Sequence, residues 1–147
     1  MIDRSIEQVL DEVGFIVTEF KGTSMNPLLK SGRDKVFIEK PKTRLKKYDI
    51  ALYKRSSGTY VLHRVYKVMP SSYIFWGDNQ LVLEYGVKDD AILGVCKVFY
   101  KGEKYIDLEK GYGFYKFYWC KSLKLRKFFN LFRRAFIKIK GVFSKKN

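Results

Sequence analysis

The sequence has 147 residues, the usual size of one domain, and 46% of them are hydrophobic, which excludes a disordered chain. Thirty Lys and Arg residues against 15 Asp and Glu residues give a net charge of +15, which indicates an anionic partner such as nucleic acid or a membrane surface. One histidine and two cysteines are too few for a zinc site or a disulfide framework, so we expect free thiols, no metal and no cofactor.

A short amphipathic helix is predicted at the start of the chain, over about residues 5–14, with Ser5 as its N-cap. Short β-branched and aromatic runs bounded by Gly, Pro or polar residues then predict strands at 15–20, 35–39, 49–54, 59–68, 73–76, 92–100 and 103–108. Many short strands with tight turns favour a mainly β fold, with a small barrel-like or sandwich core, over residues 1–109.

The tail, residues 110–147, differs in charge from the rest of the chain. It holds 12 basic and no acidic residues, whereas residues 1–109 hold 18 basic and all 15 acidic residues. Apolar side chains at helical spacing would form one face of a basic amphipathic helix, and they are Leu125, Phe128, Phe132, Phe136, Ile139 and Phe143. Such a helix is typical of binding to an anionic membrane surface, so we expect peripheral membrane association through the tail.

Other interpretations of the tail stay open. Its apolar face could pack on the β core instead of on lipid. We expect no nucleic-acid partner, because the aromatic residues lie away from the Lys and Arg residues, whereas a nucleic-acid groove interleaves the two. No run of about 18 apolar residues occurs, so no simple membrane-spanning helix is predicted. The cations favour the inner leaflet, which predicts a cytoplasmic protein at the inner face of the membrane.

Three short stretches carry residues suited to catalysis. The stretch Gly22-Thr23-Ser24-Met25-Asn26-Pro27 places a serine in a sharp turn, where its N–H can bind an oxyanion. His63 lies in a predicted strand and is the one imidazole that can serve as a base. Trp76-Gly77-Asp78-Asn79 supplies a carboxylate that can orient the imidazole. Each stretch alone is explained by turn or strand structure, and together they indicate nucleophile, base and carboxylate.

These stretches resemble the sequence boxes of the type I signal peptidases and their LexA-type relatives, which are serine peptidases on a mostly β fold. Residues 22–27 are similar to the G-x-S-M-x-P nucleophile box, Val61–Val65 to the box of the general base, and residues 77–79 to the late G-D-N box. The likeness extends to two further segments, Lys47–Ala51 and Ile92–Val95. It covers about residues 18–102.

The resemblance implies a serine endopeptidase that cleaves a leader- or signal-like peptide or a precursor protein after small residues. Ser24 would attack the peptide carbonyl, His63 would transfer the proton, and an acidic residue would orient the imidazole. Asp78 is the first choice for that acidic residue, and Glu84, six positions later, is the alternative. The box residues expected to contact the substrate are Met25 and Pro27.

The chain departs from this family before the nucleophile box. These peptidases usually carry a transmembrane helix there, whereas this segment holds only the short charged helix around residues 5–14. A second hypothesis also stays open, a catalytically silent β module that binds a peptide or a partner at a membrane surface. A self-cleaving regulator of the LexA type is disfavoured, because no helix-turn-helix pattern precedes the β core and His63 stands where those proteins have lysine.

Overall fold

The computed structural model describes residues 4–110, 115, 128, 131 and 132. The chain divides into two compact units, Met1–Gly113 and Phe114–Asn147. The first unit contains the β fold and all of the predicted catalytic residues.

The predicted N-terminal helix is confirmed as α1 (Ile6–Val13). The Ser5 side chain accepts a hydrogen bond from the Gln8 N–H, and the Gln8 side chain accepts one from the Ser5 N–H, so a capping box starts the helix. Gly14 ends it in the left-handed conformation, with φ of 85°. Leu10 is the buried residue of the helix and anchors it to the core.

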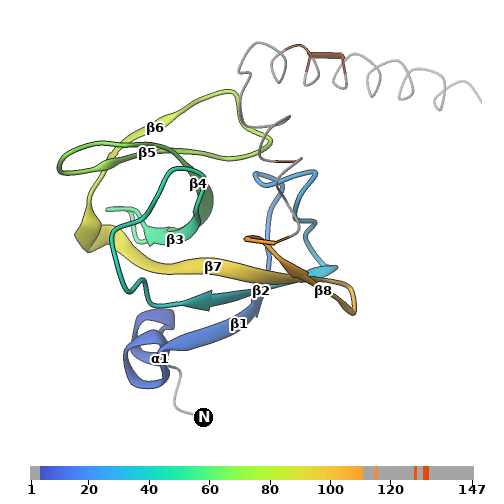
Figure 1. Ribbon diagram of the computed structural model, residues 1–147, viewed down its shortest axis with the longest axis horizontal. Coiled ribbons are helices and arrows are strands. Elements are labelled where there is room, and N and C mark those ends of the chain that lie inside the picture. The colour runs from blue at the N-terminus through green and yellow to red at the C-terminus, as the bar shows by residue number, and fades with distance from the viewer. Residues whose placement is uncertain (1–3, 111–114, 116–127, 129–130, 133–147) are drawn as a thin grey trace, which may run out of the picture. The chain divides into compact units, whose positions relative to one another are not determined.

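Eight antiparallel strands form one sheet: β1 (Phe15–Glu19), β2 (Asp34–Glu39), β3 (Ile50–Lys54), β4 (Tyr60–Val68), β5 (Tyr73–Trp76), β6 (Glu84–Val87), β7 (Ile92–Lys101) and β8 (Lys104–Asp107). A short 3-10 helix, η1 (Asp89–Ala91), precedes β7. The strand order is β1-β2-β7-β3-β4-β5-β6, and β8 also pairs with β7. Figure 1 shows β7 between β1 and β2 on one side and the curved group of β3 to β6 on the other.

The predicted mainly β fold is confirmed, but the sheet is not closed into a barrel. β1 and β6 stand at the two ends of the strand order, and within residues 4–110 they do not pair with each other. The sequence pattern predicts no strand at residues 84–87, which form β6 in the structure. Gly86 in the left-handed conformation, with φ of 74°, and the charge of Glu84 weaken the strand pattern there.

The core near His63 is built mainly on β3, β4 and β5. Its buried cluster comprises Leu45, Ala51, Tyr53, Val65, Tyr73, Phe75 and Val95. In the antiparallel pair of β3 and β4, Ala51 lies opposite His63 and Tyr53 lies opposite Val61. Tyr53 and His63 are therefore diagonal neighbours on adjacent strands, a separation that long and aromatic side chains can span.

Two of the predicted membrane-facing residues of the tail are described. Phe128 and Phe132 are 62% and 66% exposed, and their stacked rings have centroids 6.3 Å apart. Leu125, Phe136, Ile139 and Phe143 lie outside the described residues, so the amphipathic helix stays a prediction. In the part of the chain that is described, no helix is long and apolar enough to cross a bilayer.

Candidate active site

Ser24 lies in the loop that joins β1 to β2. The loop is closed at its base by the Phe20 N–H, which donates to the Asp34 carbonyl at 3.0 Å, and the Asp34 carboxylate accepts from the Lys30 N–H at 2.9 Å. Ser24 is half-buried. Within residues 4–110, the N–H of Ser24 donates no hydrogen bond, so it is available as an oxyanion donor.

The turn after β5 is joined directly to the Ser24 loop. The Asn79 N–H donates to the Ser24 carbonyl at 2.7 Å, and the Asn79 side-chain amide donates to the Thr23 carbonyl at 2.9 Å. A Cβ atom added to Gly77 would lie 2.9 Å from the Ser24 carbonyl oxygen and 3.0 Å from His63 Nε2. The three stretches singled out in the sequence therefore lie together at Gly77. Any side chain at this position would collide with the Ser24 carbonyl and crowd His63, so the position requires glycine.

Ser24 and His63 line one cleft of about 480 Å³. Apolar side chains from α1, β2, β3 and β4 contribute much of the remaining lining, among them Ile6, Val36, Ile38, Leu52 and Leu62. Gln80 lines the cleft as well. Among the hydrogen bonds of the described residues, none joins the Ser24 hydroxyl to His63, so the two side chains share the cleft without a hydrogen bond between them.

The imidazole of His63 is buried, with 2% of the residue exposed. Its Nδ1 lies 3.1 Å from Tyr53 Oη and 3.9 Å from Glu84 Oε2. Burial lowers the pKa of His63 to about 4, although the negative charge of Glu84 acts in the opposite direction. At neutral pH the ring is therefore uncharged, as a general base must be.

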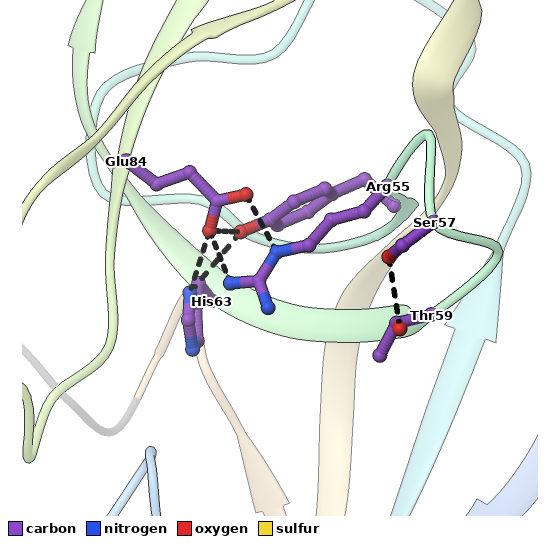
Figure 2. Close-up of polar contacts among 6 residues, drawn as sticks. Arg55, Ser57, Thr59, His63 and Glu84 are labelled. Atoms are coloured by element: carbon purple, nitrogen blue, oxygen red, sulfur yellow. Dashed lines mark hydrogen bonds and ion pairs between the residues drawn. The ribbon is translucent and has the colours of Figure 1, made fainter.

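Glu84 of β6 is the carboxylate beside His63 Nδ1. The Arg55 guanidinium donates to both of its oxygens, at 2.8 Å and 2.6 Å, and the Tyr53 hydroxyl donates to Oε2 at 2.6 Å. The bond from Arg55, aided by the bond from Tyr53, holds the pKa of Glu84 below its usual range against the opposing effect of burial. Figure 2 shows the carboxylate of Glu84 joined by dashed lines to Arg55 and to His63.

Asp78 is the first choice from the sequence for the carboxylate that orients His63, but it binds a different side chain. Its carboxylate is fully buried and accepts two hydrogen bonds from the Arg64 guanidinium, at 3.0 Å and 2.8 Å. Arg64 also donates to the Tyr48 carbonyl at 3.1 Å. These contacts direct Asp78 toward the neighbour of His63 in β4, so the geometry favours the alternative, Glu84, as the carboxylate that orients the imidazole.

The structure also places the two residues expected to contact a substrate. Met25 is completely buried and is not among the residues that line the cleft, so its contact with a substrate stays a prediction. Pro27 is exposed, but it is not among the residues that line the cleft. Cys96 is a free, buried thiol whose pKa is raised by burial to about 12, which makes it a poor nucleophile, and Cys120 lies outside the described residues.

Sequence reasoning missed Tyr53 and Arg55, because both lie in or beside a run that is typical of a core strand. A tyrosine in a buried strand is a usable signal, since its hydroxyl needs a polar partner. No protein-family model and no curated protein matches this chain.

Proposed function

We propose that this chain is a serine endopeptidase in which Ser24 is the nucleophile and His63 is the general base. The proposal is carried by the convergence at Gly77, which the Ser24 carbonyl and His63 Nε2 both approach, together with the cleft that Ser24 and His63 both line. A hydroxyl and a neutral imidazole that line one cleft are the first requirements of this chemistry.

The reaction follows from the groups present. Nε2 of the neutral His63 accepts the hydroxyl proton as Ser24 Oγ attacks the peptide carbonyl carbon. The Ser24 N–H donates to the oxyanion that forms. The protonated imidazole then gives its proton to the leaving amine. Water, activated in turn by the neutral imidazole, hydrolyses the acyl group from Ser24. The reaction requires the Ser24 hydroxyl to form a hydrogen bond to Nε2 when a peptide fills the cleft.

Glu84 takes the role of the orienting carboxylate in this proposal. Its Oε2 lies 3.9 Å from His63 Nδ1, and Arg55 keeps the carboxylate in place. A negative charge at this distance stabilises the imidazolium that forms during the reaction.

The substrate class is a leader- or signal-like peptide or a precursor protein. The resemblance of residues 18–102 to signal peptidases supports this class, and the apolar lining of the cleft supports binding of an apolar peptide segment. The exposed rings of Phe128 and Phe132, in a tail with 12 basic residues, support the further proposal that the protein works at an anionic membrane surface on the cytoplasmic side.

The experiment is a peptide library incubated with the full chain, with products identified by mass spectrometry. We expect cleavage by the wild type, at least a 1,000-fold loss in Ser24→Ala, on the order of what removal of a catalytic nucleophile costs, and wild-type rates in Ser71→Ala. Ser71 is an exposed turn serine and serves as the matched control. Equal cleavage by Ser24→Ala and the wild type would refute the proposal.

One observation favours the second function, a silent peptide-binding module. In the described part of the chain the Ser24 hydroxyl and His63 are not hydrogen-bonded, and a binding cleft needs no such contact. Under that hypothesis the wild type and Ser24→Ala bind the same library peptides equally, and neither cleaves them.

A further inference from the structure

The contact between Glu84 and His63 runs through a third side chain. Glu84 Oε2 and His63 Nδ1 are 3.9 Å apart, which is too long for a hydrogen bond. The Tyr53 hydroxyl is 2.6 Å from the carboxylate oxygen and 3.1 Å from the ring nitrogen, and it can therefore bond to both.

The position of the hydroxyl proton follows from these distances. Glu84 is ionised and can only accept, so a 2.6 Å approach of the Tyr53 oxygen requires a proton between the two oxygens. Tyr53 has a single hydroxyl proton, which is thereby committed to Glu84. The tyrosine oxygen can then only accept from His63, so the proton of the neutral ring must be on Nδ1.

We propose that Tyr53 is a positioning residue that fixes His63 in its Nδ1–H tautomer and so leaves the lone pair on Nε2. Nε2 is the ring nitrogen beside Gly77 and the Ser24 carbonyl, which is where a base for Ser24 has to accept a proton. The catalytic consequence rests on the proposed function, whereas the tautomer itself does not.

The hydroxyl is held rigidly enough for this role. Tyr53 is 1% exposed, and its ring stacks on Phe75 with centroids 4.5 Å apart. Arg55 fixes the carboxylate on the other side through two hydrogen bonds. The charged groups that act on His63 are Glu84, Arg55 and Asp78, and of these Asp78 is bound to Arg64.

The test uses nitrogen-15 NMR of the full chain labelled at histidine. His63 is the single histidine, so every ring-nitrogen signal belongs to it. At pH 7 we expect the wild type to show a protonated Nδ1 and an unprotonated Nε2. A proton on Nε2 in the wild type would overturn the proposal, and this result does not depend on any variant or on activity.

The variant Tyr53→Phe keeps the ring and removes the hydroxyl, and Tyr73→Phe is its matched control. Tyr73 is also a fully buried tyrosine whose hydroxyl donates to a carboxylate, that of Asp89, but it does not line the cleft. In Tyr53→Phe we expect a mixture of tautomers and a kcat about 10- to 100-fold lower at unchanged KM, the range for loss of one charge-assisted hydrogen bond.

Tyr73→Phe should keep both the wild-type tautomer and kcat. A Tyr53→Phe chain that folds and retains the pure Nδ1–H tautomer, or the wild-type kcat, would contradict the positioning role. If the wild type cleaves no peptide, the proposed function fails, and the NMR signals alone decide the tautomer.

Discussion

At the scale of single residues, the behaviour of the site depends on the burial of one imidazole. His63 is enclosed between β3, β5 and the turn at Gly77, and this enclosure makes protonation costly. An ordinary exposed histidine is half protonated near pH 6.5, whereas His63 keeps its lone pair down to a pH of about 4. The imidazole is therefore uncharged over the whole physiological range of pH.

We predict that the acid limb of kcat/KM has its midpoint near pH 4, the pKa of His63 in the folded chain. Peptide cleavage measured from pH 3.5 to 8, with circular dichroism at each pH to confirm folding, provides the test. A midpoint near pH 6.5 would show that the base is exposed, contrary to this structure.

The same group makes stability depend on pH. Between pH 6.5 and about 4 the unfolded chain binds a proton at this position that the folded chain does not, so stability is lost as the pH falls through that window. The loss is on the order of 3 kcal/mol at the lower end. His63→Gln removes the titrating group, and its free energy of unfolding should fall less over this window than that of the wild type. Parallel curves for the two chains would exclude the effect.

Substitution of Glu84 should mainly lower activity, whereas substitution of Asp78 should mainly lower stability. Glu84→Gln removes the charge beside Nδ1 and should lower kcat about 10-fold or more, with at most about 1 kcal/mol lost from folding. Asp78→Asn weakens the buried pair with Arg64 and should cost about 3–5 kcal/mol of folding free energy.

Kinetics and urea unfolding of the two variants, measured side by side, check this ranking. A stable Asp78→Asn chain with a larger loss of kcat than Glu84→Gln would return the orienting role to Asp78.

At the scale of elements, the site exists because two loops and one strand meet. The loop after β1 carries Ser24, β4 carries His63, and the turn after β5 is bonded to the first loop through Asn79. Gly77 is the point of closest approach, so its lack of a side chain is a requirement of the site and not only of the turn.

Gly77→Ala should lower kcat at least 10-fold, because its Cβ would collide with the Ser24 carbonyl and displace His63 Nε2. Overpacking of this kind also costs about 1–3 kcal/mol of stability. Gly58→Ala is the control, because its Cβ meets nothing within 4 Å and the left-handed φ of 83° alone makes it unfavourable. That control should lose about 1–2 kcal/mol of stability and keep its activity. Kinetics and thermal unfolding of both variants test this prediction. A fully active Gly77→Ala variant would contradict the requirement for glycine at this position.

The elements were largely predictable from local sequence, whereas their contacts were not. The capping residues Ser5 and Gln8 and the turn at Gly58 locate α1 and the β3–β4 hairpin, because these signals act within a few residues. β6 was missed since its four residues include a glycine and a glutamate. Whether the sheet closes depends on the partners of β1 and β6, which no local pattern specifies.

In the candidate site, too, single residues could be predicted from local sequence, whereas their contacts could not. Ser24 could be singled out by the turn between Gly22 and Pro27, and His63 could be singled out because it is the one histidine. The choice between Asp78 and Glu84 could not be made, because it depends on which of them Arg64 and Arg55 engage across strands. Met25 could be named from its motif, but only the packing reveals that it is buried.

At the scale of the whole molecule, the dominant property is the uneven charge. The tail carries 12 of the 30 basic residues and none of the acidic ones, and two of its described aromatic residues, Phe128 and Phe132, are exposed. Cations beside exposed apolar groups fit an anionic lipid surface, where each Lys or Arg adds roughly 1 kcal/mol to binding.

We predict that the full chain co-sediments with anionic liposomes, that neutral liposomes bind it weakly, and that added salt releases it. A chain truncated after Lys110 should stay in the supernatant and keep the melting temperature of the β fold. Loss of folding in the truncated chain would instead favour packing of the tail on the core, and a full chain that remains in the supernatant at low salt would exclude the membrane proposal.

The central claim is that Ser24 attacks a peptide with His63 as its base. Intact-protein and peptide mass spectrometry of an acid-quenched reaction with a cleaved library peptide tests it most directly. The expected result is an acyl adduct of the amino-terminal product on Ser24 during turnover, and its absence in Ser24→Ala and in His63→Gln. A reaction in which the peptide is cleaved while Ser24 carries no acyl group, or in which His63→Gln acylates as fast as the wild type, would contradict the claim.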